Sequence, residues 1–488
     1  MADKKEKSII KNAFYSFVKS FMTLIFPLIT FPYASRILLP EGIGKINFAN
    51  SIVTYFIIIA ELGITKYATR EASRLRNDND KLTKFCKEIF TINMISTAIS
   101  YTLFFIACFN IPKLKEYRVL LFVCSGKIFF MTVGIDWFFR AIEEFKYITI
   151  RSIIFQFISL IFLFMFVKTK DDYVEYAIFG MISSVGSNIC NIFYARHFIN
   201  LNAKIKLELK KHLKYVFTFF GMSLITSVYE ILDTSMLGFL SNDTQVGLYS
   251  AGIKINKMTV EVIIAISAVF LPRFSIYFNE DDKEHFNSLA INGFMFITMI
   301  GLPMIAGLFL LSEPFVRLFC GPEYLEAVPL MKIITPILLF LALSNFMGAQ
   351  ILPAINKEKV SMISYICAAT VNITLNFIFI PKYGAIGAAI GTVFAEGMEM
   401  IFQLFYLHKL FFIKKIFVNF IQTIIATIVM FFGIKFLMSI ISNYVIQLLV
   451  CISTGIIIYF LVLLLFRNKV LGMFLEKIKN KFSKKFEK

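Results

Sequence analysis

Four charged side chains in two neighbouring apolar stretches suggest the first chemistry. Glu230 and Asp233 are three residues apart, and so are Lys254 and Lys257. Each pair therefore lies on one face of a helix. A polar turn at 242–244 makes the two stretches a hairpin. At about 1.5 Å of rise per residue, Asp233 then lies at the depth of Lys254. Glu230 and Lys257 are matched in the same way, about 20 Å from the turn.

Two interpretations of these matched charges stay open. A charged side chain at the centre of a bilayer costs about 2.5–3.5 kcal/mol on insertion scales, so two ion pairs would cancel this cost. Alternatively, the four side chains line a hydrated cavity, in which the lysines bind an anionic substrate. Asp233 and Glu230 are then candidates for carrying a coupling proton or sodium ion. Both interpretations hold together if the pairs exchange partners during transport.

The composition places these residues in a membrane protein. Of the 488 residues, 58% are hydrophobic and only 17% are charged, whereas soluble domains carry about 25% charged residues. This balance excludes an ordinary soluble enzyme, a secreted disulfide scaffold and a disordered protein. The seven cysteines are scattered through apolar runs, and neither they nor the four histidines show metal-ligand spacing. We therefore expect no metal site and no enzymatic activity.

About fourteen apolar stretches are long enough to cross a bilayer, which takes about 20 residues. They are 12–36, 44–68, 86–109, 117–139, 148–168, 173–198, 212–240, 246–272, 286–311, 326–352, 359–380, 384–408, 416–440 and 444–466. About 32 lysines and arginines lie in the tails and alternate loops of one side, and about 9 lie on the other. This asymmetry predicts an even number of spans with both termini in the cytoplasm. It also accounts for the net charge of +18, so this charge does not indicate that the protein binds nucleic acid.

Further basic residues lie inside the predicted spans. Lys19 lies a third of the way along the first span, and Lys127 lies deep in the fourth. Arg36 and Arg151 have side chains long enough to reach the lipid headgroups, and we expect both to do so. No loop exceeds about 16 residues on this map, so the chain is a compact helical bundle of the kind that transporters form.

One acidic pair lies late in the chain. Glu396 and Glu399 are three residues apart in the twelfth predicted span, so they share a helix face. Polar groups of neighbouring helices are their expected partners.

Two segments about 203 residues apart look alike. In each, a span ends, a short turn follows, and a glycine precedes a bulky residue two positions on and a small residue five positions on. The glycines are Gly44 and Gly247. Duplication of a six-helix unit is a common transporter plan, and an even repeat gives both halves one orientation. The alternative is that each segment is simply a good turn between helices.

Two runs of the sequence resemble a known family. The first covers 26–38 and 40–49, and the second covers 136–147 at the end of the fourth span. Both are similar to O-antigen and capsule flippases of the Wzx type, in the MATE/MOP superfamily. Leu39 departs from the pattern, because the family often has glycine before this proline. The residues that carry the likeness are Pro27, Pro32, Arg36, Gly42, Gly44, Asp136 and Trp137.

The resemblance implies an all-α polytopic membrane protein of about fourteen helices. Two pseudo-symmetric six-helix lobes would surround a central cavity, with two further helices at the C-terminus. It predicts an N-terminal lobe over 1–210, a C-terminal lobe over 211–410, two additional helices over 411–466 and a basic cytoplasmic tail over 467–488.

The resemblance also implies a substrate and a reaction. The expected substrate is a short oligosaccharide on undecaprenyl diphosphate, moved from the cytoplasmic to the outer leaflet by alternating access. Sugar hydroxyls and a diphosphate lose their hydration in hydrocarbon at large cost, so a hydrated, partly cationic groove lowers the barrier. Depth and spacing give the candidate ligands of the diphosphate and sugar as Lys254, Lys257, Arg36, Lys19 and Lys127.

Other functions on the same fold are a MATE-like cation antiporter for drugs or metabolites and a lipid II flippase. Short loops argue against a membrane glycosyltransferase. No cofactor is expected apart from a coupling proton or sodium ion. The expected surroundings are the bacterial cytoplasmic membrane, lipid-linked oligosaccharide and the polysaccharide polymerase machinery, with no nucleic acid.

Overall fold

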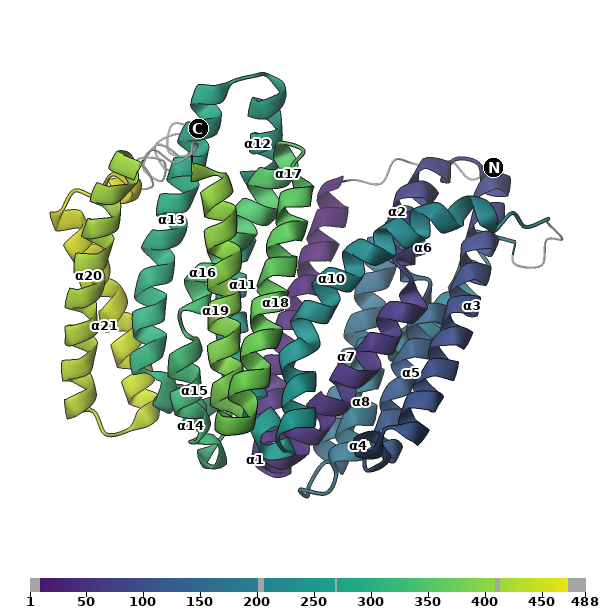
Figure 1. Cartoon of the computed structure of the whole chain (residues 1–488), viewed down its shortest axis with the longest axis horizontal. Coiled ribbons are helices and arrows are strands. Elements are labelled where there is room, and N and C mark those ends of the chain that lie inside the picture. The colour runs from purple at the N-terminus through teal and green to yellow at the C-terminus, as the bar shows by residue number, and fades with distance from the viewer. Residues whose placement is uncertain (1–8, 201–205, 268–269, 409–412, 473–488) are drawn as a thin grey trace. The chain divides into compact units, whose positions relative to one another are not determined.

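The computed structural model describes residues 9–200, 206–267, 270–408 and 413–472, and every regular element in these ranges is helical (Figure 1). The all-α fold expected from the sequence is thus confirmed. The chain forms two compact units, Met1–Gly247 and Leu248–Lys488. The predicted lobe boundary at residue 210 stays a prediction. Most of the predicted basic tail, residues 473–488, lies outside the described residues.

The helices of the first unit run from the N-terminus to the start of α11. They are α1 (Ile9–Glu61), α2 (Ile64–Leu75), α3 (Asn79–Asn110), α4 (Pro112–Lys115), α5 (Arg118–Gly134), α6 (Asp136–Ala141), α7 (Phe145–Phe166), α8 (Tyr173–Val185), η1 (Gly186–Asn188), α9 (Ile189–Ala195) and α10 (Lys210–Leu240).

The second unit takes up most of α11 and everything that follows. Its helices are α11 (Asp243–Ser267), α12 (Phe270–Asn279), α13 (Lys283–Leu310), α14 (Ser312–Phe319), η2 (Pro322–Tyr324), α15 (Ala327–Ile334), α16 (Ile337–Asn345), the π-helical turn η3 (Phe346–Ile351), α17 (Leu352–Ala354), α18 (Glu358–Tyr383), α19 (Ala385–Tyr406), α20 (Ile413–Ile440) and α21 (Tyr444–Leu465).

Eleven helices among the described residues are long and apolar enough to cross a membrane, or twelve if a bent pair at 243–265 and 270–279 forms one span. The protein is therefore a multi-span membrane protein, but the expected count of about fourteen is not confirmed. Two differences contribute. Two of the expected spans, 12–36 and 44–68, lie largely in α1, where they are counted together across a kink at Leu39, and α5 has only 17 residues. A helix of that length is about 26 Å long, slightly less than the roughly 30 Å of a hydrocarbon core.

A break at Leu39 divides α1. This residue has φ 59° and ψ 175°, while the motif prolines Pro27 and Pro32 lie within continuous helix before it. Positive φ brings a Cβ atom into conflict with the backbone, so residues other than glycine adopt it rarely. Glycine would adopt it without strain. The departure from the family pattern at Leu39 thus lies at the position where the backbone most favours glycine.

The turn after this break packs directly against the start of α11. A Cβ atom added at Gly44 would overlap the carbonyl oxygen of Asp243, and one added at Gly247 would overlap the carbonyl oxygen of Pro40. Only glycine lets two backbones approach so closely. Gly44 and Gly247 are as far apart in sequence as Pro40 and Asp243. The two copies of the expected duplication therefore meet in a reciprocal contact, which supports a true repeat.

We expect Gly44→Ala to lower the stability of the first unit, because the added methyl group must push the Asp243 backbone aside. Overpacking of this kind costs about 1–3 kcal/mol. The matched control is Gly180→Ala in α8, where an added Cβ atom meets nothing within 4 Å and alanine is favoured by about 0.5–1 kcal/mol. Melting temperature and monodisperse yield in detergent measure both effects. Equal values for the two variants would rule out the close contact.

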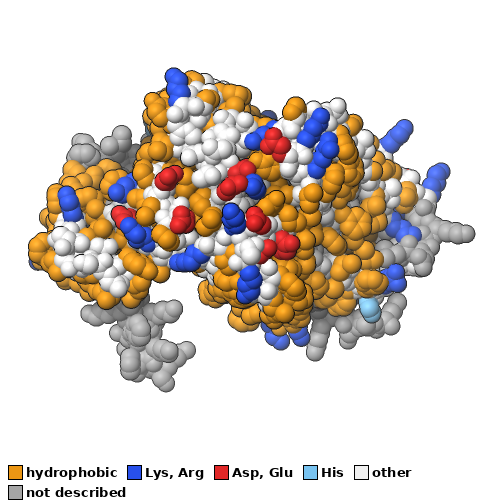
Figure 2. Space-filling view, turned by 90° about the horizontal axis from the view of Figure 1, so that it is seen from below, with side chains coloured by type: hydrophobic (Ala, Val, Ile, Leu, Met, Phe, Trp, Pro, Cys, Tyr) orange, Lys and Arg blue, Asp and Glu red, His pale blue; other side chains and the backbone are white. Residues whose placement is uncertain are grey.

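The outer flanks of the helices are apolar. Leu465 of α21 is 83% exposed, and exposed Phe432 and Phe436 of α20 are further examples. Figure 2 shows side chains of both charges gathered on the face seen from below, with hydrophobic side chains around them. An apolar flank of this kind is typical of a surface that contacts lipid, because soluble proteins rarely expose large contiguous apolar areas.

Aromatic side chains fill the interior of the first unit around α6. Trp137, Phe138 and Phe139 are buried there, and Trp137 meets Phe85 of α3 edge to face at 6.2 Å between ring centres. Tyr67 of α2 belongs to the same cluster. Because these three consecutive side chains of α6 are buried, the position of Asp136, which precedes them, is fixed.

The two C-terminal helices are anchored to the second unit through α13. Cys451 and Tyr459 of α21 and Met430 of α20 pack in one cluster with Met295 and Met299 of α13. The Tyr459 hydroxyl also donates a hydrogen bond of 2.5 Å to the carbonyl oxygen of Met299. The expected pair of additional helices is thus a packed part of this unit.

Candidate functional site

A sharp break between two helices places Asp136. α5 ends at Gly134, and Ile135 is left-handed with φ 36° and ψ 38°. α6 then begins at Asp136. Asn191 of α9 donates a side-chain hydrogen bond to the carbonyl oxygen of Gly134, which satisfies an acceptor that the helix end leaves open. The break turns the Asp136 carboxylate toward α1 and α7.

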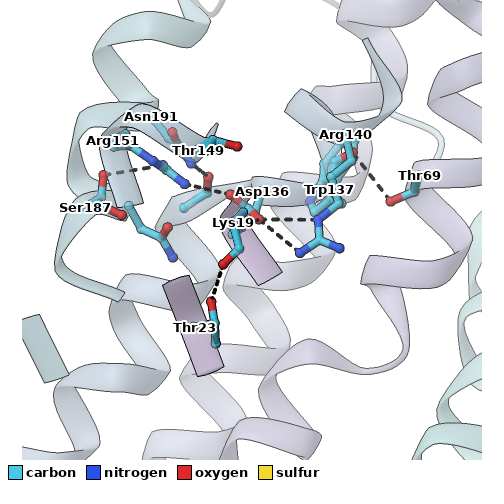
Figure 3. Close-up of polar contacts among 12 residues, drawn as sticks. Lys19, Thr23, Thr69, Asp136, Trp137, Arg140, Thr149, Arg151, Ser187 and Asn191 are labelled. Atoms are coloured by element: carbon cyan, nitrogen blue, oxygen red, sulfur yellow. Dashed lines mark hydrogen bonds and ion pairs between the residues drawn. The ribbon is translucent and has the colours of Figure 1, made fainter. Parts of the chain in front are cut away.

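Three cationic side chains surround this carboxylate (Figure 3). Arg151 of α7 donates from Nη2 to Oδ1 of Asp136 at 2.7 Å. Nε and Nη2 of Arg140 each lie 3.3 Å from Oδ2, and the Lys19 ammonium lies 3.7 Å from Oδ2. One negative charge therefore faces three positive charges. Glu61 of α1 also interacts electrostatically with Arg140, so the cluster keeps a surplus of about one positive charge in an apolar bundle.

Arg151 is the buried member of the cluster. Its side chain is 5% exposed, and Nη1 donates to the carbonyl oxygen of Ser187 at 3.3 Å. The guanidinium carbon also lies 5.4 Å from the ring centre of Tyr147. The expectation that Arg151 reaches the lipid headgroups is therefore wrong. A buried guanidinium needs a counter-charge and several acceptors, and Asp136 and Ser187 supply them.

Lys19 and Arg140 are the accessible members. Their side chains are 29% and 50% exposed. The Lys19 distance is longer than a good charge-assisted hydrogen bond, so Asp136 holds this ammonium only weakly. An incoming anion can thus draw both cations toward itself while Arg151 continues to neutralise Asp136. Phosphate oxygens suit this set, because arginine binds them bidentately and lysine acts as a point charge.

Contacts of Asn12, near the start of α1, show how deep the Asp136 cluster lies in the bundle. Asn12 Nδ2 donates to Glu143 Oε2 at 3.1 Å, and Glu143 also pairs with Arg76. Lys19 lies seven residues beyond Asn12 in the same helix, which is about 10 Å. The cluster therefore lies inside the bundle but within reach of this end.

Two other predicted ligands lie elsewhere in the first unit. Lys127 of α5 donates a hydrogen bond of 2.6 Å to Asn50 Oδ1 of α1. Arg36 is exposed and donates to the carbonyl oxygen of Pro32 at 2.6 Å. Arg36 is also about 25 Å along α1 from Lys19. The structure thus brings only Lys19, among the predicted ligands of this unit, to the Asp136 cluster.

The four residues of the predicted hairpin belong to different units. Glu230 and Asp233 are on α10 in the first unit, with Glu230 exposed. Lys254 and Lys257 are on α11 in the second unit, with Lys257 exposed. Each expected pair would join one unit to the other, so the pairing stays a prediction.

Five of the motif residues have surroundings that concern the backbone or the core. Pro27 and Pro32 lie inside α1, and Trp137 is buried in the aromatic cluster. Gly44 permits the contact with α11, and a Cβ atom at Gly42 would lie 3.1 Å from Cβ of Leu38. Of the motif positions, Asp136 has the charge contacts of a functional site.

A second polar cluster was not expected from the sequence. Glu88 of α3 is fully buried and accepts from His212 Nε2 at 2.8 Å, from Lys211 Nζ at 3.0 Å and from the Glu208 backbone N–H at 2.9 Å. His212 Nδ1 lies 2.8 Å from the Tyr67 hydroxyl. The only signal in the sequence is an acidic residue within a basic segment. This cluster ties the start of α10 to α2 and α3.

In the described ranges, no group of three or more histidine, cysteine, aspartate or glutamate side chains is placed to hold a metal ion. The Asp136 cluster offers one fixed and two partly exposed cations to which an anion can bind.

The segments that build this cluster belong to a recognised family. The sequence profile described as "Polysaccharide biosynthesis protein" matches residues 9–278, which is more than half of the chain. The chain belongs to the polysaccharide biosynthesis protein family. A second profile, MatE, matches residues 219–378. The family expected from the runs at 26–49 and 136–147 is thus confirmed.

Several known proteins resemble this polysaccharide biosynthesis protein. A protein of Escherichia coli (strain K12) named "Putative O-antigen transporter" is 26% identical over 406 residues, which are 80% of this chain and 94% of the relative. "Capsular polysaccharide biosynthesis protein CapF" of Staphylococcus aureus is 23% identical over 414 residues, which are 83% and 100% of the two chains. The lipid II flippase MurJ, in an inward closed conformation, matches with a TM-score of 0.75 and 18% identity, over 94% of this chain and 100% of MurJ. The two chains share a fold.

Proposed function

We propose that this protein moves oligosaccharide repeat units on undecaprenyl diphosphate from the cytoplasmic to the outer leaflet by alternating access. The observation that carries the proposal is the surplus of positive charge around Asp136, with Lys19 and Arg140 partly exposed. Lys19 and Arg140 would each pair with one of the two phosphates. These contacts would offset the free-energy cost of the hydration that the diphosphate loses on entering the bundle. The product would serve O-antigen, capsule or a related surface polysaccharide.

The remaining predicted ligands would act at other stages of the passage. Lys254 and Lys257 on α11 would receive the diphosphate in the second unit, and Lys127 and Arg36 would contact the head group in the first. Asp233 and Glu230 on α10 remain candidates for a coupling proton or sodium ion. Since the lipid tail would stay in the bilayer, only the head group needs these polar contacts.

The orientation in the membrane follows from the basic segments of the first unit. Lys84 of α3 donates a hydrogen bond of 3.0 Å to Glu208 and holds the pKa of that carboxyl below its ordinary value. Lys211 pairs with Glu88. The basic residues at the starts of α3 and α10 therefore lie at one end, which the positive-inside rule places in the cytoplasm. We infer a bacterial cytoplasmic membrane, cytoplasmic termini and contact with the polysaccharide polymerase machinery.

The names of relatives favour this substrate over the alternatives. Relatives named for O-antigen and for capsular polysaccharide align over four fifths of the chain. A lipid II flippase shares the fold, and the MatE profile covers part of the chain. A cation antiporter would bind its substrate at surplus negative charge, whereas the Asp136 cluster has surplus positive charge.

Deletion of the gene in its native bacterium tests the proposal. We expect surface polysaccharide to disappear and lipid-linked repeat units to accumulate on the cytoplasmic face, with recovery when the wild-type gene is returned. Accumulated units are assigned by their resistance to enzymes added outside spheroplasts. Normal polysaccharide in a strain without a second flippase would refute the proposal. Trapped lipid II in place of repeat units would identify the peptidoglycan precursor as the substrate.

A further inference from the structure

A polar network holds the start of α10 against α2 and α3. The side chain of Glu88 is 1% exposed, and its carboxylate accepts hydrogen bonds from His212 Nε2 and from the Glu208 backbone N–H. The Lys211 ammonium lies 3.0 Å from the same carboxylate. The other ring nitrogen of His212 lies 2.8 Å from the Tyr67 hydroxyl of α2. These five residues form the Glu88 cluster.

Further contacts between α2 and α10 adjoin the Glu88 cluster. The rings of Tyr67 and Tyr215 are stacked, with 5.7 Å between their centres. A Cβ atom added at Gly63, directly before α2, would overlap the Phe220 backbone nitrogen. α10 therefore contacts α2 or the residue before it over about two turns, from His212 to Phe220.

The helix α10 is fastened to the first unit near its two ends. At the far end from the Glu88 cluster, Ser235 Oγ lies 2.8 Å from the Tyr55 hydroxyl of α1. A Cβ atom added at Gly238 would overlap the ring of Phe48. Between the two ends, over 221–234, no described side chain is buried. Loss of the contacts with α2 and α3 would therefore free one end of α10 while the other end stays attached.

The chemistry of the Glu88 cluster suits a contact that opens. Replacing a buried ion pair by apolar side chains is often neutral or stabilising, so buried charge is a poor way to join two helices permanently. Charged groups regain their hydration when they separate. The side chains of Lys211, Glu208 and Lys84 at the edge of the cluster are 45%, 56% and 33% exposed. Water therefore reaches the charges as soon as the helices part.

Two aromatic side chains connect the Glu88 cluster to Asp136. The Phe85 ring of α3 meets the His212 ring edge to face at 5.4 Å between centres, and it meets the Trp137 ring in the same way at 6.2 Å. Thr69 of α2 donates from Oγ1 to the Trp137 carbonyl oxygen at 3.4 Å. Trp137 directly follows Asp136 in α6. Because close-packed interiors transmit strain, a shift of α6 at Asp136 disturbs the groups packed against His212.

We propose that the Glu88 cluster is a latch that releases the start of α10 during transport, and that phosphate binding at the Asp136 cluster controls the release. A phosphate group draws Arg140 of α6 toward itself, and the displaced α6 loosens the packing around His212. The role in transport and the control by phosphate rest on the proposed function, whereas the opening of the latch does not. The coupling is reciprocal, so opening the latch changes the phosphate affinity by the same factor.

A thiol reporter tests the opening without any substrate. Val216 of α10 is fully buried in the apolar cluster that contains Tyr67, so the thiol of V216C reacts with a water-soluble maleimide while the start of α10 is released. Mass spectrometry of the full-length protein in lipid bilayers gives the reaction rate. A minor state is populated at about 0.1–10%, and E88Q should raise this population and the V216C rate about tenfold.

Two internal controls make this measurement specific. The native Cys124 of α5 is fully buried, so its reaction rate reports unfolding and should not change. E116Q removes a glutamate that is 68% exposed and pairs with Lys113, and it should leave the V216C rate unchanged. The latch is overturned if E88Q does not raise the V216C rate, or raises it only together with the Cys124 rate.

Locking the latch tests its role in transport. K84C/E208C lets a short bifunctional thiol reagent join α3 to the segment before α10, because the native side chains meet at 3.0 Å. Crosslinking should lower translocation of lipid-linked repeat units in proteoliposomes by about tenfold or more, and cleavage of the linker should restore it. K210C/K214C places both thiols at exposed positions within α10, so the same treatment should leave its transport unchanged. Full transport by crosslinked K84C/E208C would exclude the latch from the transport cycle.

Inorganic pyrophosphate, which carries the two phosphates without sugar or lipid, tests the control. It should raise the V216C rate about fivefold, and R140Q should abolish this rise. If repeat units are transported but pyrophosphate changes nothing, the control by phosphate fails alone. If no repeat units are transported while E88Q still raises the V216C rate selectively, the proposed function fails and the latch stands.

Discussion

Lys19→Gln is expected to lower translocation of lipid-linked repeat units by about 10- to 100-fold without unfolding the protein. The variant removes a charge-assisted contact to phosphate, which contributes about 1.5–3 kcal/mol. Stability should change little, because the Lys19 side chain is 29% exposed and its ammonium lies 3.7 Å from Asp136, and such pairs contribute about 0–1 kcal/mol. The measurement is the ratio of outward- to inward-facing lipid-linked units in cells, divided by the amount of protein in the membrane.

The matched control for this variant lies in the same helix. Lys45 pairs with Glu41 one turn away, at the other end of α1 from Asp136, and is similarly exposed. Lys45→Gln should leave translocation near the wild-type level, and Lys19→Arg should retain most of it because the charge stays. If Lys45→Gln lowers translocation as much as Lys19→Gln does, the positive charges of α1 matter only for inserting the protein into the membrane. Full activity of a stably inserted Lys19→Gln would remove Lys19 from the site.

Asp136→Asn is expected to destabilise the first unit by about 3–5 kcal/mol, the usual effect of leaving a buried charge without its partner. The variant leaves Arg151, whose side chain is 5% exposed, beside Lys19 and Arg140 with no counter-charge. Melting temperature and membrane abundance measure the loss. Arg140→Ala is the control, since its side chain is 50% exposed and an exposed pair contributes about 0–1 kcal/mol.

A second substitution shows whether the loss comes from Arg151. Replacing both partners of a buried ion pair by uncharged groups of similar size is often nearly neutral. Asp136→Asn combined with Arg151→Met should therefore regain most of the lost stability. If the double variant is as unstable as the single one, Asp136 acts through the start of α6 rather than through Arg151.

The sequence predicts most of the helices because runs of about 20 apolar residues have few other uses. The expected spans 148–168 and 444–466 match Phe145–Phe166 and Tyr444–Leu465 closely. Hydropathy separates the spans 12–36 and 44–68, but it does not show that only a kink at Leu39 divides the two helical parts of α1. That outcome depends on backbone angles and on the packing of Gly44, which hydropathy does not measure.

Only part of the site is predictable in the same way. Lys19 and Asp136 stand out as charges in apolar runs, and a sequence motif includes Asp136. The pairing of Asp136 with Arg151 is not predictable, because the turn at Glu143 (φ 59°) separates α6 from α7 and helical spacing does not cross such a break. The contact of Gln403 with Glu399 is predictable, since the two residues are four apart in one helix. The contact of Gln403 with Ser364 is not, because Ser364 lies on another helix.

The reciprocal contact at Gly44 and Gly247 has the form of an isologous interface. In a two-fold dimer, residue i of one subunit touches residue j of the other, and residue j touches residue i in return. Here both partners of each contact belong to one polypeptide, at equal separations in sequence. The duplicated turns thus act as a dimer fused into a single chain. Such an interface is closed on itself, and no second molecule is needed to complete it.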